Sequence, residues 1–267
     1  LNDDSVHPDS YYRITSYTDV GAPSTAEEVT ADTEGAVRHP WSMQNCPQLF
    51  VLPEDTGDLK AGTLICAGVA VPVEEGAEEV ADAGYGGLWD SSLDLYYSTD
   101  GGATWTFQST IATGGENGRN IMGYDPVWEP FFVYYDDTLI CYYSDETVPG
   151  DNGGQILVYK TSKDGGETWS DAVTIVDTNA RPGMPVVAEM LTGQWILTYE
   201  TVGWNPIKAG YKIAENPFDW ENISDWGDTI PGINGTYGGS PYVYTLEDGR
   251  IIAGTGSLEE VFVNTKL

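Results

Sequence analysis

Histidine and cysteine are scarce in this 267-residue chain, and each scarcity removes a class of site. Only His7 and His39 are present, so histidine-based zinc sites and catalytic triads have almost no material. The three cysteines, Cys46, Cys66 and Cys141, are too few for a disulfide scaffold, and none forms a CxxC pair. We therefore expect no metal and no cofactor, and we expect Cys66 and Cys141 to be buried and reduced.

Basic residues and long apolar runs are also lacking. The chain has 11 Lys and Arg against 42 Asp and Glu, a formal net charge of -31. Such a surface repels nucleic acid, anionic lipid and polyanionic glycans, so a neutral or cationic ligand is favoured. No apolar run reaches the roughly 18 residues of a membrane helix. The chain begins at Leu1 without a hydrophobic signal region, so we expect that its natural start lies upstream.

Glycine and aromatic residues, by contrast, are abundant. The chain contains 32 Gly, 15 Pro, 17 Tyr and 9 Trp, and no amphipathic helical stretch of useful length. This composition is typical of many short strands joined by tight turns. We expect one all-β domain that spans residues 1–267.

An internal repeat supports this prediction. Four segments share an outline in which a residue plus proline precedes an apolar strand, a polar turn and a second apolar strand. The four dipeptides are Cys46-Pro47, Glu129-Pro130, Met184-Pro185 and Ser240-Pro241. The second strands begin near Leu64, Leu139, Trp195 and Ile251, at offsets of 75, 56 and 56 residues. A repeat of this period is typical of propellers and other repeat architectures.

Two of these units also contain an Asp-box, S-x-D-x-G-x-T-W. The copies are STDGGATW (residues 98–105) and SKDGGETW (162–169), and ENPFDW (215–220) is a degenerate third copy. We expect the aspartate to brace a turn and Trp105 and Trp169 to occupy equivalent places. The pattern predicts a β-propeller of four-stranded antiparallel blades; a β-sandwich, the main competitor, does not explain two successive offsets of 56.

The ends of the chain predict an incomplete propeller. Residues 11–17 suit the outer strands of an earlier blade, and residues 261–267 suit a third strand without a fourth. Between them, the acidic segment 73–87 should overhang the face that carries Glu129. We interpret it as a solvated loop, with a calcium-binding or substrate-rim loop as the alternative.

Two glutamates are the candidate catalytic residues. In a blade, the first strand starts and the second strand ends on the same face, so residues there line one central funnel. Glu129 precedes the strand-leading proline of one unit, and Glu200 ends the second strand of the next. A pair of carboxylates is what glycoside hydrolysis requires, because one protonates the leaving oxygen and the other attacks or activates water.

Further candidates should contact the substrate at the same funnel. Arg181 would neutralise the nucleophile or bind sugar hydroxyls, with a structural ion pair as the alternative. The candidate walls and hydrogen-bonding groups are Asp125, Trp128, Tyr199, Trp204, Tyr242 and Glu260.

Several of these segments resemble the exo-α-1,5-L-arabinanases of glycoside hydrolase family 93. The segments are GYDPVWEPF (residues 123–131), ARPGM (180–184), WILTYE (195–200), GSPY (239–242) and EVF (260–262), within a resemblance over residues 47–262. It implies a six-bladed propeller that releases arabinobiose from arabinan ends with retention, and it implies that Glu129 and Glu200 are the catalytic pair. Which of the two is the nucleophile stays open, with Glu129 preferred as the acid/base.

The resemblance thus predicts a secreted, monomeric hydrolase of a neutral plant oligosaccharide or polysaccharide. A sialidase and a non-catalytic glycan-binding propeller are the alternatives. Sialidase chemistry grips an anionic sugar with three arginines, and the chain has five, Arg13, Arg38, Arg119, Arg181 and Arg250, of which Arg250 should lie in a turn on the far face. The strong negative charge also opposes an anionic substrate.

Overall fold

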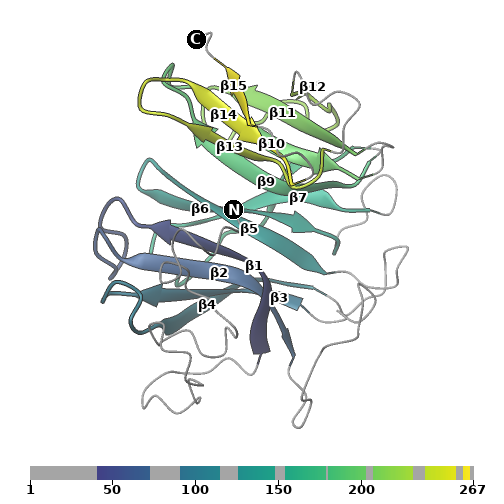
Figure 1. The fold of residues 1–267 in the computed structure, drawn as a ribbon. Coiled ribbons are helices and arrows are strands. Elements are labelled where there is room, and N and C mark those ends of the chain that lie inside the picture. Colours follow the sequence, from purple (N-terminus) through teal and green to yellow (C-terminus); the bar gives the residue numbers. More distant parts are fainter. Residues whose placement is uncertain are drawn as a thin grey trace, which may run out of the picture.

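The computed structural model describes residues 41–72, 91–114, 126–147, 154–178, 180–202, 207–230, 238–256 and 261–264. All regular elements in these ranges are β-strands, arranged in four antiparallel sheets (Figure 1). The first sheet contains β1 (Trp41–Val51), β2 (Leu64–Pro72), β3 (Ser91–Ser98) and β4 (Thr106–Gly114). The second contains β5 (Val127–Tyr135), β6 (Thr138–Asp145), β7 (Ile156–Ser162) and β8 (Val173–Val176). The third contains β9 (Pro182–Glu189), β10 (Trp195–Thr201), β11 (Lys208–Ala214) and β12 (Asp228–Thr229). The fourth contains β13 (Tyr242–Thr245), β14 (Ile251–Gly254) and β15 (Phe262–Asn264).

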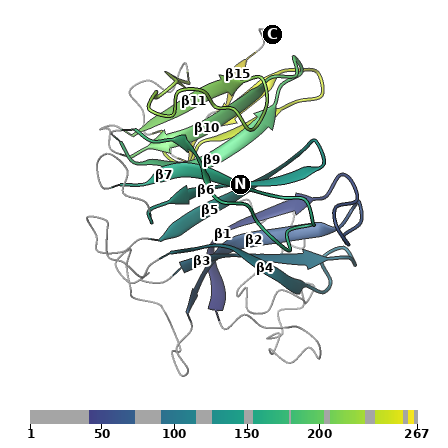
Figure 2. The ribbon, with the colours of Figure 1, turned by 180° about the vertical axis from the view of Figure 1, so that it is seen from behind.

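The sheets are the blades of a β-propeller. Each strand pairs with the next one in the chain, and the first strands, β1, β5, β9 and β13, contact one another in succession. The four sheets follow one another side by side in the front and rear views (Figure 2). The predicted fold is therefore confirmed, and a two-layer sandwich is excluded. The last sheet has three strands among the described residues, as the pattern predicted.

The hairpin β5–β6 shows how the sequence builds a blade. Its strands are aromatic and β-branched, and Asp136 and Asp137 join them with φ angles of 50° and 53°. Two positive φ values in a two-residue loop match a type I′ turn, whose twist suits the flanking strands. The strands extend beyond the apolar runs at residues 131–135 and 139–143.

A residue of positive φ precedes the proline of each first strand, and in three of the four blades this dipeptide lies in a bulge. The preceding residues, Cys46, Glu129, Met184 and Ser240, have φ angles of 50°, 61°, 55° and 52°. In β1, β5 and β9 the pairing register shifts at these dipeptides, so the strand passes through the proline instead of starting after it. Positive φ in a non-glycine residue costs about 1–3 kcal/mol and is concentrated at functional sites. The strain recurs at the same place in all four blades.

The two Asp-boxes adopt one structure. Asp100 accepts hydrogen bonds from Ser98 Oγ (2.8 Å) and the Thr104 N–H (2.9 Å), and Asp164 accepts the corresponding bonds at 2.7 and 3.0 Å. The ring of Trp105 packs on Gly102, and that of Trp169 packs on Gly166. The indole N–H of Trp169 donates to Ser109 Oγ in the preceding blade, whereas that of Trp105 donates to the Gly102 carbonyl.

Apolar side chains fill the spaces between neighbouring blades. One cluster joins the first two sheets and includes Ile65, Leu95 and Phe132. A second joins the second sheet to the third and to β13, and it includes Tyr142 and Leu197. Cys66 on β2 and Cys141 on β6 follow this pattern: both are buried and free, as predicted. Within the described residues no helix could cross a membrane.

Candidate active site

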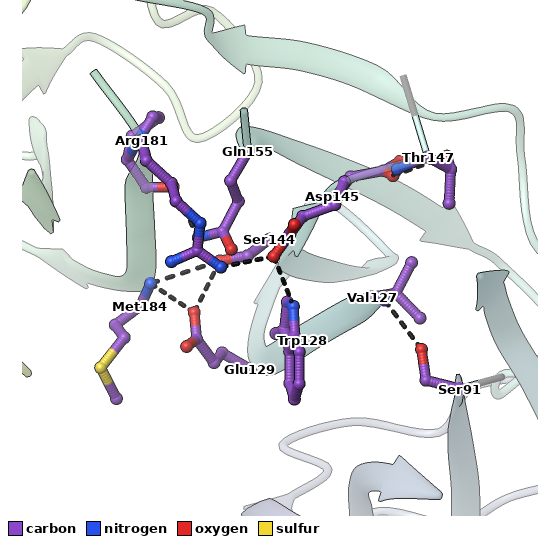
Figure 3. Close-up of polar contacts among 12 residues, drawn as sticks. Ser91, Val127, Trp128, Glu129, Ser144, Asp145, Thr147, Gln155, Arg181 and Met184 are labelled. Carbon is purple, nitrogen blue, oxygen red and sulfur yellow. Dashed lines mark hydrogen bonds and ion pairs between the residues drawn. The ribbon is translucent and has the colours of Figure 1, made fainter. Parts of the chain in front are cut away.

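Glu129 stands in the bulge of β5, where its side chain is held from the next blade. Its Oε2 accepts hydrogen bonds of 2.6 Å from Ser144 Oγ on β6 and of 2.6 Å from the Met184 N–H on β9. Figure 3 shows Ser144, Met184 and Arg181 gathered around this carboxylate. The positive φ of Met184 turns its N–H toward Glu129, so the strained bulge of one blade fixes the acid of its neighbour.

Glu200 approaches the same place from β10. Its Oε2 accepts a hydrogen bond of 2.9 Å from the N–H of Ser240, the residue of positive φ that precedes Pro241 in the following blade. Glu200 pairs with Gly183 on β9, and Ser144 pairs with Trp128 on β5. Ser144 and Glu200 therefore occupy the same register position in consecutive blades.

Gly183 lies between the two carboxylates. A Cβ at this glycine would be 3.3 Å from Glu200 Oε1 and 3.5 Å from Glu129 Oε2. These two oxygens consequently lie within about 7 Å of each other, and Gln155 Nε2 lies 2.6 Å from the same Cβ position. The predicted convergence of acids from adjacent blades is present in the structure.

The surroundings of Glu129 stabilise the protonated form of its carboxyl group. Burial raises the pKa of its carboxyl to about 7, and the negative charge of Glu200 acts in the same direction. The hydrogen bonds from Ser144 and Met184 and the positive charge of Arg181 oppose this rise. A carboxyl group with a pKa near neutral pH can both donate and accept a proton, as acid/base chemistry requires.

Arg181 and Trp128 flank Glu129 and share one partner. Glu146 Oε1 accepts a hydrogen bond of 2.9 Å from the indole N–H of Trp128 and forms an ion pair with Nη2 of Arg181. Glu146 is 5% exposed, whereas the side chain of Arg181 is 39% exposed. The ion-pair alternative for Arg181 is thus present, and Arg181 still faces solvent and Glu129.

Tyr242 begins β13 and lines a channel between the inner strands. The channel is about 430 Å³ and is bordered by residues from β1, β5, β9 and β13. Tyr242 is 52% exposed, and its ring contacts Phe131 edge to face at 6.3 Å between centroids. The structure therefore leaves Tyr242 accessible to a ligand.

The prediction for Tyr199 is wrong. This side chain is fully buried, packs against Gly210 on β11 and donates its hydroxyl hydrogen bond to the Trp226 carbonyl. Successive side chains of a strand point to opposite faces, so Tyr199 points into the core of the blade when Glu200 points to the funnel. The candidates Asp125, Trp204 and Glu260 and the acidic segment 73–87 lie outside the described residues.

Four residues of the site were not predicted from the sequence. Ser144 could have been found, since it occupies the Glu200 position of the preceding blade. Gln155 is buried beside Gly183 and donates to the Pro182 carbonyl at 2.7 Å. Cys46 lies close to both acids: burial, with the charges of Glu129 and Glu200, raises the pKa of its thiol to about 12. Glu146 had no signal in the repeat.

Two observations on the described residues concern metal ions and anionic sugars. No group of three or more His, Cys, Asp or Glu side chains in the described part of the chain could hold a metal ion. Of the two arginines described, Arg181 pairs with Glu146, and Arg250 pairs with Asp248 on a turn between β13 and β14.

Among known proteins, the chain is similar to several of solved structure. No family model and no curated protein sequence matches the chain. Among solved structures, the chain is similar to the GH93 α-L-arabinofuranosidase of Fusarium graminearum with arabinobiose (32% identity, TM-score 0.69, 85% of this chain and 63% of that chain). It is similar to the Penicillium chrysogenum α-L-arabinanase complexed with arabinobiose (33% identity, TM-score 0.69, 84% and 62%).

A more distant likeness concerns the fold alone. A family 117 glycoside hydrolase of Zobellia galactanivorans aligns at 12% identity with a TM-score of 0.57, over 83% of this chain and 65% of that chain. The chain spans somewhat less than two thirds of the length of the family 93 structures. The resemblance to family 93 that the sequence predicted is confirmed.

Proposed function

We propose that this protein is a retaining glycoside hydrolase that releases arabinobiose or a similar short product from the ends of α-1,5-L-arabinan. The observation that carries the proposal is the meeting of Glu129 and Glu200 over Gly183, on one face of adjacent blades. A glycan-binding module has no need of two acids that lie this close together.

The chemistry divides between the two carboxyl groups. One protonates the glycosidic oxygen while the other attacks the anomeric carbon, and water then hydrolyses the glycosyl-enzyme with the first group as base. Retaining enzymes place these groups about 5–5.5 Å apart and inverting enzymes about 6.5–9.5 Å apart. The limit of about 7 Å between Glu200 Oε1 and Glu129 Oε2 leaves out most of the inverting range.

The substrate proposal rests on charge and on the relatives. Two similar proteins have been crystallised with arabinobiose, a neutral disaccharide. A chain with net charge -31 suits a neutral polysaccharide better than a sialoside. Since polymers of this kind are met outside the cell, we propose a secreted, monomeric enzyme.

Product analysis tests the proposal. Incubation with debranched arabinan should release a short arabino-oligosaccharide, and a sialoside should stay intact. Glu129→Gln and Glu200→Gln should each lower turnover by several orders of magnitude with the fold retained. Binding of arabinan without turnover by the unaltered protein would instead favour the glycan-binding alternative.

A further inference from the structure

Glu146 is a buried acid that joins two segments on either side of Glu129. It follows β6 and is 5% exposed. Its Oε1 contacts Trp128, the residue before Glu129, and Arg181, which lies three residues before Met184. Met184 in turn donates to Glu129 Oε2. A single carboxylate oxygen thus connects the strand that carries the catalytic acid to the strand that holds it.

The exposure of the partners separates this contact from ordinary packing. A buried charge is costly unless it is paired and hydrogen-bonded, and Glu146 is both. Its partners, however, are not buried: Arg181 is 39% exposed, and Trp128 is partly exposed beside Glu129. Long side chains near a funnel normally sample several rotamers, so a fixed anion beneath them restricts their positions.

Loss of the Glu146 contacts would affect Arg181 and, through it, Glu129. A hydrogen bond to a charged group contributes more than a neutral one, and its loss leaves the partners free to move. Arg181 also acts on Glu129 by its charge, which lowers the carboxyl pKa. Any displacement of Arg181 would therefore change both the wall of the site and the field at the acid.

We propose that Glu146 is a positioning residue that holds Arg181 and Trp128 against a sugar bound over Glu129 and Glu200. It acts through these two side chains and does not touch the substrate. The inference rests on the proposed hydrolase function, which it deepens by assigning a role to an acid outside the catalytic pair.

A double-mutant cycle tests the role in catalysis. Glu146→Gln keeps an acceptor for Trp128 and removes the ion pair, and we expect it to raise KM for an arabino-oligosaccharide about 10-fold with kcat changed less than about 3-fold. Because Glu146 acts through Arg181, the double variant Glu146→Gln/Arg181→Met should be no worse than Arg181→Met alone. The control Asp248→Asn breaks the exposed pair with Arg250 and should leave KM unchanged. An unchanged KM in Glu146→Gln, or penalties that add in full, would overturn the proposal.

A second readout does not depend on hydrolysis. The indole N–H resonance of Trp128, identified by its loss in Trp128→Phe, should shift in Glu146→Gln and also in Arg181→Met, and stay in place in Asp248→Asn. An indole N–H resonance of Trp128 that is unchanged in both variants would disprove the positioning contact even if arabinan is cleaved. If arabinan is not cleaved and the resonance shifts, the contact stands and the hydrolase proposal fails.

Discussion

The peptide N–H of Ser240 donates a hydrogen bond of 2.9 Å to Oε2 of Glu200. The Met184 N–H makes the equivalent bond of 2.6 Å to Glu129. Each acid is thus held by the backbone N–H of the residue of positive φ that precedes the proline in the following blade. The strained dipeptide that recurs in the fold serves as the support of the candidate site.

Replacement of Glu129 by Gln should stabilise the protein above neutral pH. The folded-state pKa of about 7 lies above the ordinary value of 4.5, so the folded protein binds more protons between these two values. The free energy of unfolding therefore falls by at most about 3 kcal/mol as pH rises from about 4.5 to 7. The Glu129→Gln variant has no carboxyl group at this position and should not lose this stability. Urea unfolding at pH 4 and pH 8 should show a gain for Glu129→Gln that is confined to pH 8.

The exposed Glu189 on β9 provides the matched control. Glu189→Gln should change the unfolding free energy by the same small amount at both pH values. An equal effect of Glu129→Gln at pH 4 and pH 8 would contradict the elevated pKa of Glu129.

The sequence was sufficient to predict the blades and the two acids, because both follow the repeat. The dipeptide Glu129-Pro130 marks a bulge, and the 56-residue period then brings Glu200 to the same face. The prediction for Tyr199 is wrong because neighbouring side chains of a strand point to opposite faces, and Glu200 points to the funnel. The ring of Tyr199 packs instead against Gly210. Glu146 could not be predicted, since its contact with Arg181 depends on how consecutive blades are placed side by side.

Loss of the Asp164 side chain should weaken the second Asp-box. Asp164 accepts bonds from Ser162 Oγ and Thr168, and the turn that it braces packs against Thr56 of the preceding blade. We expect Asp164→Ala to lower Tm by about 2–4 °C, as a loss near 1 kcal/mol does in a domain of this size. Asp171→Ala, at an exposed position, should leave Tm unchanged in the same thermal scans. Equal Tm values for the two variants would refute the bracing role.

A side chain at position 183 should block catalysis. A Cβ there would come within 2.6 Å of Gln155 Nε2 and enter the space between the acids, so Gly183→Ala should lower kcat/KM at least about 100-fold. The matched control is Gly154→Ala, whose Cβ meets Arg181 Cβ at an ordinary 3.8 Å. Both variants should keep the unfolding midpoint within a few degrees, as circular dichroism would report. Full activity in Gly183→Ala would show that the space over Gly183 is not where the sugar reacts.

Chemical rescue should separate the roles of Glu129 and Glu200. An aryl arabinoside with an activated leaving group needs no proton to depart, so a variant that lacks only the acid/base still forms the glycosyl-enzyme, and azide then accepts the sugar. The raised pKa of Glu129 suits a proton donor, whereas the two donors on its Oε2 suit a fixed nucleophile. In the acid/base variant, azide attacks the glycosyl-enzyme, so we expect an arabinosyl azide of retained α configuration. In the nucleophile variant, azide can only displace the aryl group directly, so any azide product should have the inverted β configuration. The variant that forms the α-configured azide therefore identifies the acid/base. An α-configured azide from both variants, or no azide product from either while arabinan is still cleaved by the unaltered protein, would contradict the assignment of these two glutamates as the catalytic pair.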